Sequence, residues 1–289
     1  MGRVFSYSAI EAGKVPQPHD FKQAAVLFAE LAEGGIRSGA IDGSFIYGSV
    51  ALGVANYRSD FDALLSLNSQ RPSSYSAARV ITQQLLLETE HTIPVLPIVQ
   101  TKNALKVGNH EMDRFFGQHL MGDYRIVQGN DPAGYMEFAN HPAGEILSSY
   151  LFQKKRRLAN SYAIADPLDV NEGGIQRMLE LPQAVGRKLL QAVIEADHVL
   201  EVPETLQRTA EKSMVLGETR KLLRDNGIGE GFEGLVVAND EYDVLLEETI
   251  KGGVDEETYH DVIRGFHANL PIAITWIEQV EQSFLPLFR

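Results

Sequence analysis

Hydrophobic positions in the first half of the chain follow two periodicities. Over residues 19–34 apolar side chains recur every three or four positions, which predicts an amphipathic helix that ends at Gly34-Gly35. Shorter runs that are rich in β-branched and aromatic residues, bounded by Gly, Pro, Asn and Asp, predict strands. The strands are expected at residues 42–47, 60–67, 93–100 and 124–127, and further helices near Ser49 and over 74–90. Together they indicate an α/β or α+β unit built on a short mixed sheet.

The second half of the chain has a different pattern. From residue 141 to 285 the strand signal fades and amphipathic helices follow one another, as in an all-α helical bundle. The helix breaks are expected at Asp166-Pro167, Val202-Pro203-Glu204, Gly227-Ile228-Gly229 and Gly252-Gly253. We therefore expect two domains, residues 1–138 and residues 139–289, with the helical second domain contacting a substrate or a partner.

Composition narrows the class of protein. The chain has 289 residues, of which 44% are hydrophobic, as expected of a globular protein with packed cores. No apolar run approaches the roughly 20 residues that a membrane-spanning helix needs, and no secretory signal pattern opens the chain, so we expect a cytoplasmic protein without a membrane partner. Cysteine is absent, so any metal must bind through oxygen or imidazole ligands.

Charge is strongly acidic, with a net value of −13 and a pI near 5.1. Broad affinity for nucleic acid is therefore not expected, because Lys and Arg supply that affinity. The one dense basic cluster is Lys154-Lys155-Arg156-Arg157, which is either a solvated helix face or a contact for phosphate or RNA. An acidic enzyme also attracts cationic small substrates.

Two carboxylates stand at alternate positions where a predicted strand begins. Asp60 and Asp62 flank Phe61, and side chains at i and i+2 of a strand project to the same face. The pair can therefore share one cation. Hard oxygen ligands suit Mg²⁺ or Mn²⁺, which binds through one or two carboxylates together with substrate phosphates and water. This arrangement is typical of phosphoryl or nucleotidyl transfer.

A glycine-serine bend precedes the acidic pair. The strand that carries Phe45-Ile46-Tyr47 breaks at Gly48-Ser49 before a predicted helix, which offers backbone N–H groups and a positive helix end to a phosphate. Arg58 adds a guanidinium that matches phosphate geometry, and Asn56 can shape the loop between the two motifs.

In this order and spacing the motifs resemble the signature of the DNA polymerase beta-like nucleotidyltransferase superfamily. Gly48-Ser49 is followed after ten residues by Asp60-x-Asp62, and Ser59 is the serine that often precedes the first aspartate. The resemblance covers residues 20–135. The remainder matches only in being helical, as are the second domains of many members, among them the aminoglycoside nucleotidyltransferase-like ones. It implies transfer of a nucleotidyl group, usually AMP from ATP, to an acceptor hydroxyl. Asp60 and Asp62 would bridge the metal ions, and Gly48, Ser49, Arg58 and Ser59 would hold the nucleotide.

One departure from the family pattern weakens the resemblance. Family members usually supply a third carboxylate from a following strand, but residues 93–100 contain no acid, and Leu96 or Pro97 stands in the expected place. The alternatives are outlying residues: Glu88, Glu90, His91, Glu111, Asp113, Glu145 and Glu172.

The leading hypothesis is an enzyme that acts on a small-molecule acceptor, with an aminoglycoside-like polycation ahead of RNA or protein. The second hypothesis is a catalytically degenerate binding or antitoxin-like protein, and the third is a helical interaction protein.

The remaining chemistry-bearing residues favour ordinary structural roles. His110, Glu111, Asp113 and His119 lack the spacing of a zinc site and indicate a capped helix. Trp276 is expected in the core of the final helix.

Overall fold

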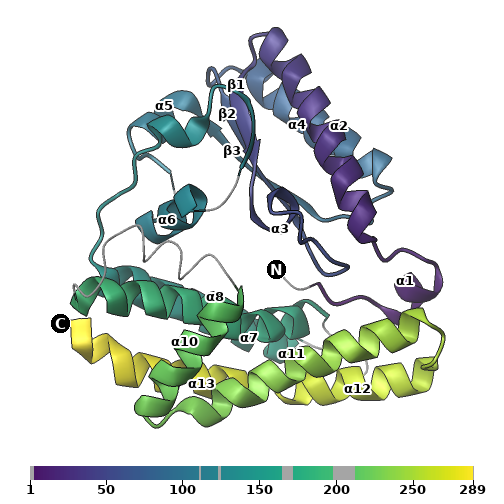
Figure 1. Cartoon of the computed structure of the whole chain (residues 1–289), viewed down its shortest axis with the longest axis vertical. Helices are drawn as coiled ribbons and strands as arrows, with labels where there is room; N and C mark the ends of the chain where they lie inside the picture. The colour runs from purple at the N-terminus through teal and green to yellow at the C-terminus, as the bar shows by residue number, and fades with distance from the viewer. Residues whose placement is uncertain (1–2, 111, 123–124, 165–171, 198–211, 289) are drawn as a thin grey trace. The chain divides into compact units, whose positions relative to one another are not determined.

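The computed structural model describes residues 3–110, 112–122, 125–164, 172–197 and 212–288 (Figure 1). The chain groups into two compact units. Unit 1 contains residues 15–140, and unit 2 contains residues 2–14 together with 141–289. The segment before residue 15 thus belongs with the helices of the second half, where Phe5 N–H donates to the Tyr242 hydroxyl over 2.8 Å and the Tyr259 hydroxyl donates to the Phe5 carbonyl oxygen over 2.5 Å. The expected division into domains at residues 138 and 139 stays a prediction.

Unit 1 is a mixed α/β structure around a four-stranded sheet in the order β3-β2-β1-β4. β1 pairs antiparallel with β2 and β4, whereas β2 and β3 are parallel, so the expected mixed sheet is confirmed. Its elements are α2 (Pro18–Arg37), β1 (Ile41–Ile46), α3 (Gly48–Ala51), β2 (Phe61–Leu67), α4 (Pro72–Glu88), β3 (Val95–Thr101), α5 (Lys102–Lys106), α6 (Arg114–Gly122), β4 (Ile126–Gly129) and η1 (Pro132–Tyr135).

Each face of the sheet has its own hydrophobic core, because neighbouring strand residues point to opposite faces. α2 and α4 cover one face (Figure 1), where Phe21 and Phe28 pack against Ala63 and Leu65. The other face carries Phe45, Tyr47 and Leu64, which pack with residues of α5, α6 and η1. The candidate site lies at the end of β1 on this second face.

The first helix of unit 1 is longer than expected. α2 does not end at Gly34-Gly35 but continues to Arg37 and stops before Gly39, whose φ is +75°. Gly35 lies inside the helix. A side chain at this position would clash with β1, because a Cβ built there would stand 2.6 Å from Cγ1 of Ile41. The glycine therefore permits close helix–strand packing rather than ending the helix.

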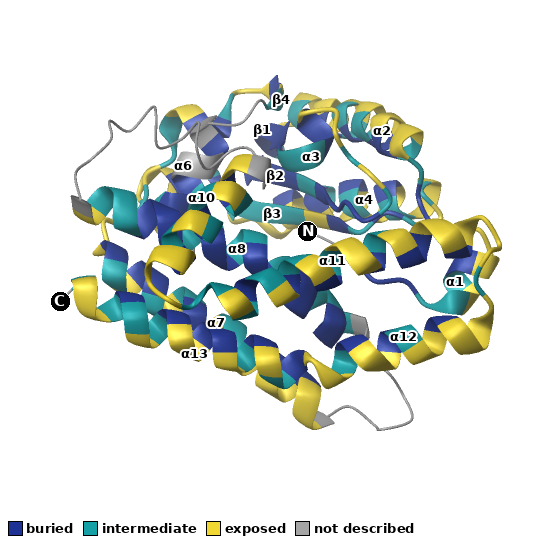
Figure 2. Ribbon diagram, turned by 60° about the horizontal axis from the view of Figure 1, so that its bottom comes forward, coloured by how far each residue is buried: buried dark blue, intermediate teal, exposed yellow. Residues whose placement is uncertain are grey.

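The secondary structure of unit 2 is all helical within its described residues, as expected for the second half. Its elements are α1 (Tyr7–Glu11), α7 (Ala143–Ile164), α8 (Glu172–Asp197), α10 (Lys212–Asp225), α11 (Gly229–Ile250), α12 (Glu256–Ala268), α13 (Leu270–Phe284) and η2 (Leu285–Phe288). Its helices carry buried residues on one side and exposed residues on the other (Figure 2). Trp276 is 1% exposed, which confirms its place in the core.

Two of the four expected helix breaks lie within the described residues. Gly227-Ile228-Gly229 separates α10 from α11, and Gly252-Gly253 separates α11 from α12. The expected breaks at residues 166–167 and 202–204 lie outside the described residues. A further break, not expected from the sequence, falls at Asn269, which ends α12 and begins α13.

Candidate functional site

The acidic pair stands where β2 begins. Asp60 immediately precedes the strand and is 5% exposed, and Asp62 is its second residue and half-buried. The Phe61 N–H between them donates to the Pro94 carbonyl oxygen over 2.8 Å, which joins this end of β2 to the segment entering β3. Because side chains alternate along an extended backbone, the two carboxylates belong to the same face of the sheet.

Tyr47 lies beside the acidic pair. The Tyr47 N–H donates to the Asp62 carbonyl oxygen over 3.1 Å, so the two residues are neighbours where β1 ends beside β2. Burial raises the pKa of the Tyr47 hydroxyl, and the charges of Asp62 and Asp60 raise it further. The phenol stays protonated, since its charged form would be buried beside two negative charges.

The glycine-serine bend directly adjoins the acidic pair. Gly48 has a φ of +69°, and a Cβ at that residue would lie 3.0 Å from Asp62 Oδ2. The absence of a side chain therefore brings the backbone of the bend against the carboxylate. The half-buried Ser49 follows, and its carbonyl oxygen accepts from the Val54 N–H over 3.0 Å. The bend therefore lies against the second carboxylate of the Asp-x-Asp motif.

The helix after the bend is shorter than the phosphate-binding hypothesis assumed. α3 has only four residues, Gly48–Ala51, and Gly53 follows it with a φ of +72°. A single turn has few aligned peptide dipoles, so any attraction for phosphate must come from individual N–H groups and not from a helix dipole.

The loop between the bend and the acidic pair is held by Asn56 and Ser59. The Ser59 hydroxyl accepts from the Asn56 N–H over 3.0 Å and donates to Asn56 Oδ1 over 3.3 Å, and Oδ1 also accepts from the Arg58 N–H over 3.0 Å. Asn56 thus shapes the loop as expected. Ser59 uses its hydroxyl in the same turn, and it had been expected to contact the nucleotide. Arg58 is 6% exposed, so its side chain is largely shielded from solvent.

The position of the missing third carboxylate is defined by strand register. Asp62 pairs with Leu96 in the parallel β2–β3 ladder, and Leu96 is 52% exposed. Paired residues of adjacent strands point to the same face, so an apolar side chain stands beside the acidic pair. Among the residues that the structure describes, no group of three or more His, Asp or Glu side chains is arranged to hold a metal.

The outlying acids have other positions. Asp113 Oδ1 accepts from the Phe116 N–H over 2.8 Å at the start of α6, which agrees with the expected capped helix. Glu90 and His91 occupy a turn with φ values of 49° and 58°. Glu145 is exposed in the first turn of α7 in unit 2. Glu111 and the side chains of His119 and Glu172 lie outside the described residues.

Sequence reasoning missed a polar network on the first residues of β1. The Asp42 carboxylate is 8% exposed and accepts from Lys102 Nζ over 2.7 Å, from Asn130 Nδ2 over 3.1 Å and from the Tyr135 hydroxyl over 2.9 Å. Burial acts to raise the pKa of Asp42, but these hydrogen bonds outweigh it and the net pKa is lowered. No sequence motif pointed to Asp42, because its hydrogen-bond partners lie 60 to 93 positions away in sequence.

Comparisons with known proteins do not assign a family. No protein-family model matches the chain, and no curated protein is significantly similar to it. Within the described part of the chain, no helix is both long and apolar enough to cross a bilayer.

Proposed function

We propose that unit 1 is a nucleotidyltransferase domain that binds a nucleoside triphosphate with Mg²⁺ or Mn²⁺ and transfers a nucleotidyl group, AMP from ATP, to an acceptor hydroxyl. Asp60 and Asp62 are the proposed metal ligands, and Gly48, Ser49 and Arg58 the proposed triphosphate contacts. Ser59 supports that loop.

One observation carries the proposal. Asp60 and Asp62 stand at alternate positions where β2 begins, and a Cβ at Gly48 would lie 3.0 Å from Asp62 Oδ2. Two carboxylates on one side of a backbone bend form a donor set for a hard divalent cation that also binds phosphate oxygens. Among the described residues no third carboxylate joins these two in a metal-binding group, so the triphosphate would complete the coordination.

The proposed reaction is an in-line substitution at phosphorus. The acceptor oxygen forms a bond to the α-phosphorus, the bond to the oxygen bridging the β-phosphate breaks, and pyrophosphate leaves. Divalent cations held by the acidic pair would lower the pKa of the acceptor hydroxyl and neutralise the phosphates. Arg58 and the backbone of the bend then orient the triphosphate, which is the main contribution of a protein to such a transfer. The hydroxyl proton passes to water, because the strand position beside Asp62 carries Leu96.

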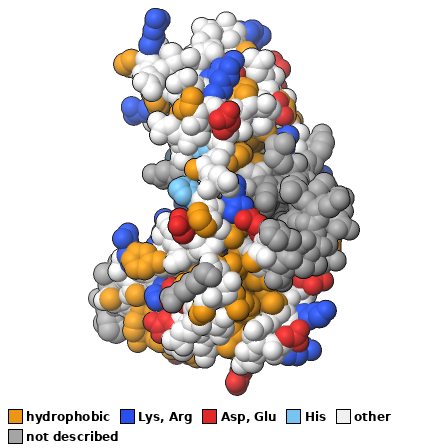
Figure 3. All heavy atoms as spheres, turned by 90° about the vertical axis from the view of Figure 1, so that its left-hand side faces the viewer, with side chains coloured by type: hydrophobic (Ala, Val, Ile, Leu, Met, Phe, Trp, Pro, Cys, Tyr) orange, Lys and Arg blue, Asp and Glu red, His pale blue; other side chains and the backbone are white. Residues whose placement is uncertain are grey.

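A small-molecule acceptor suits the charge of the chain. A net charge of −13 attracts cations over long range, so an aminoglycoside-like polycation with free hydroxyl groups is the preferred class. Figure 3 agrees on the face that it draws, where Lys and Arg side chains are scattered among acidic and apolar ones. A nucleic-acid acceptor would favour a broad basic field.

Leu96 favours a second candidate function. An exposed leucine in register with Asp62 occupies the place where a third acid would act, so the domain retains a nucleotide site but transfers slowly or not at all. Such a protein would act as a binding or antitoxin-like regulatory partner whose bound nucleotide changes its affinity for another molecule.

Calorimetric titration of MgATP tests the proposed function. The wild type is compared with the Asp60→Asn, Asp62→Asn double variant, and with Asp243→Asn on α11 as a control for loss of one carboxylate in unit 2. We expect magnesium-dependent binding that the double variant loses and the control keeps. Equal magnesium-dependent affinity in all three proteins would exclude the acidic pair as the metal site.

Turnover separates the two candidates. Labelled ATP with Mg²⁺ or Mn²⁺ is incubated with a panel of hydroxyl acceptors, and products are resolved by chromatography. A nucleotidyl product that forms with wild type and not with Asp62→Asn supports the enzyme. Tight MgATP binding without product for any acceptor supports the regulatory protein.

A further inference from the structure

The basic cluster of residues 154–157 divides into different environments on α7. Lys155 is a structural contact, because its Nζ lies 2.6 Å from Glu281 Oε2 and 3.8 Å from Glu278 Oε1 on α13. Lys154 is half-buried on the side of α7 that faces α8, and Arg156 and Arg157 are exposed. A solvated helix face therefore does not describe the whole cluster.

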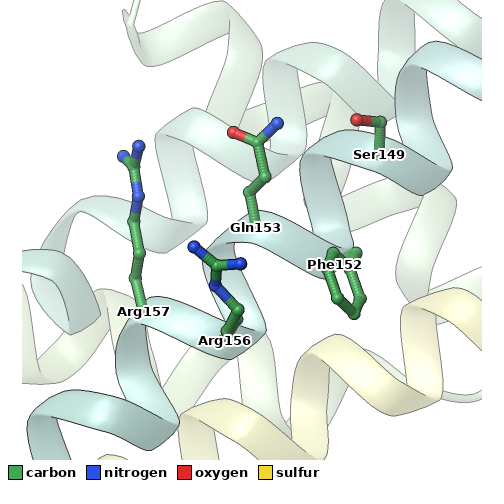
Figure 4. A pocket seen from close by; sticks show the side chains of 5 residues that line it. All are labelled: Ser149, Phe152, Gln153, Arg156 and Arg157. Atoms are coloured by element: carbon green, nitrogen blue, oxygen red, sulfur yellow. The ribbon is translucent and has the colours of Figure 1, made fainter.

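The two arginines line a cavity on α7. It has a volume of about 350 Å³, and its described lining comprises Ser149, Phe152, Gln153, Arg156 and Arg157. Ser149, Gln153 and Arg157 project to the same side of the helix (Figure 4), as their four-residue spacing requires. These five described residues offer guanidinium, amide and hydroxyl donors beside the Phe152 ring, and none of the five is a carboxylate. Donors of this kind recognise phosphate oxygens, and guanidinium does so with two parallel hydrogen bonds.

Positive charge continues from this cavity into the contact between α7 and α8. Lys154 Nζ and Lys188 Nζ lie 5.3 and 5.6 Å from the centre of the Tyr150 ring. Arg177 of α8 donates to the Ser161 hydroxyl of α7. Burial lowers the pKa of Lys154, and Arg157 and Arg177 lower it further, while Glu180 acts in the opposite direction.

Lys154, Arg157, Arg177 and Lys188 therefore gather around Tyr150 and Glu180 where α7 meets α8, in a chain whose net charge is −13. Arg177 and Lys188 stand on nearly the same side of α8, eleven residues and roughly 16 Å apart along the helix axis. One phosphate group is too small to contact both ends of this row, whereas linked phosphates contact several of its members.

We infer that the α7/α8 face of unit 2 is a binding site for a small molecule that carries two or more linked phosphate groups. Arg157 and Lys154 are the central contacts, Arg156 and Gln153 extend the site across the cavity, and Lys188 extends it along α8. An acidic chain overall disfavours a long nucleic acid, so a compact polyanion is the fitting class. This site is independent of the acidic pair in unit 1 and needs no divalent cation.

Calorimetric titration with inorganic tripolyphosphate tests the inference, with the full chain and excess EDTA so that magnesium-dependent binding is silent. We expect saturable binding by wild type. Arg157→Gln and Lys154→Met should each weaken it about tenfold or more, the effect of losing one charge-assisted contact. Arg157 is exposed, so its variant should melt like wild type, and this keeps the test interpretable should Lys154→Met fold poorly.

Two controls define the outcome. Arg79→Gln removes one exposed positive charge from α4 in unit 1, and Asp62→Asn removes the proposed metal site. Both should bind tripolyphosphate like wild type. The inferred polyphosphate site can therefore fail its test while the proposed function stands, and the proposed function can fail while the polyphosphate site stands. Absence of saturable binding, equal weakening in Arg79→Gln and Arg157→Gln, or stronger competition by a single-stranded RNA than by tripolyphosphate would each overturn it.

Discussion

Gly48→Ala is the substitution that most directly probes the contact between the bend and the acidic pair. The backbone of Gly48 has a φ of +69°, which L side chains rarely adopt, and an added Cβ would stand 3.0 Å from Asp62 Oδ2. The variant therefore has two costs. One is backbone strain, and the other is displacement of the Asp62 carboxylate by a few tenths of an ångström.

The strain can be separated from the displacement by a matched variant. Gly53, at the other end of the same short helix, has a φ of +72°, and no heavy atom lies within 4 Å of a Cβ built there. Alanine in the left-handed region costs about 1–2 kcal/mol at either position. A loss of 1 kcal/mol lowers Tm by roughly 2–8 °C, depending on domain size. Both variants should therefore melt a few degrees below wild type.

Binding should distinguish the two variants. Gly48→Ala moves a proposed metal ligand, so we expect MgATP affinity to fall about tenfold, which corresponds to about 1.4 kcal/mol. Gly53→Ala should bind MgATP like wild type. Calorimetric titration and thermal melting measure the two effects on the same samples. If both variants bound MgATP equally, or Gly53→Ala lost more affinity, the contact between Gly48 and Asp62 would have no part in the site.

Three further predictions follow from single contacts. Asp42→Asn should destabilise unit 1 by about 1–3 kcal/mol in chemical denaturation, since a buried charged acceptor is lost. Because folding lowers the pKa of Asp42, its contribution is present above the unfolded pKa and disappears as pH falls through the folded pKa, so wild type and variant should converge in acid. Leu96→Asp should strengthen Mn²⁺ binding in calorimetry and reduce stability without metal, and unchanged Mn²⁺ affinity would contradict the register argument. Ser59→Ala should lower the free energy of unfolding by about 1 kcal/mol in thermal melting, because the loop loses the hydrogen bond from the Asn56 N–H. A loss of MgATP affinity larger than this loss of stability would contradict a purely structural role for Ser59.

The sequence predicted the secondary structure of unit 1 well because its signals are local. Apolar residues recur at helical spacing in α2, and β-branched and aromatic runs mark β1 and β2. Local signals also placed Gly48-Ser49 directly after a strand. The same reasoning ended α2 too early, since a glycine that admits Ile41 looks identical in sequence to one that ends a helix. It also missed the break at Asn269, which is marked by Pro271 in the first turn of α13 and not by a glycine.

For the candidate site, sequence and structure contributed different parts. Alternation along a strand is a property of the backbone, so the sequence by itself predicts that Asp60 and Asp62 share a face. It also determined that residues 93–100 bring no acid. Only the tertiary structure decided that Leu96 is the residue opposite Asp62, because register depends on how two separate strands pair. Folding likewise decided that Gly48 touches Asp62, that Asp42 meets Lys102 and Tyr135, and that Lys154 faces α8. These contacts join residues distant in sequence, and no local pattern encodes them.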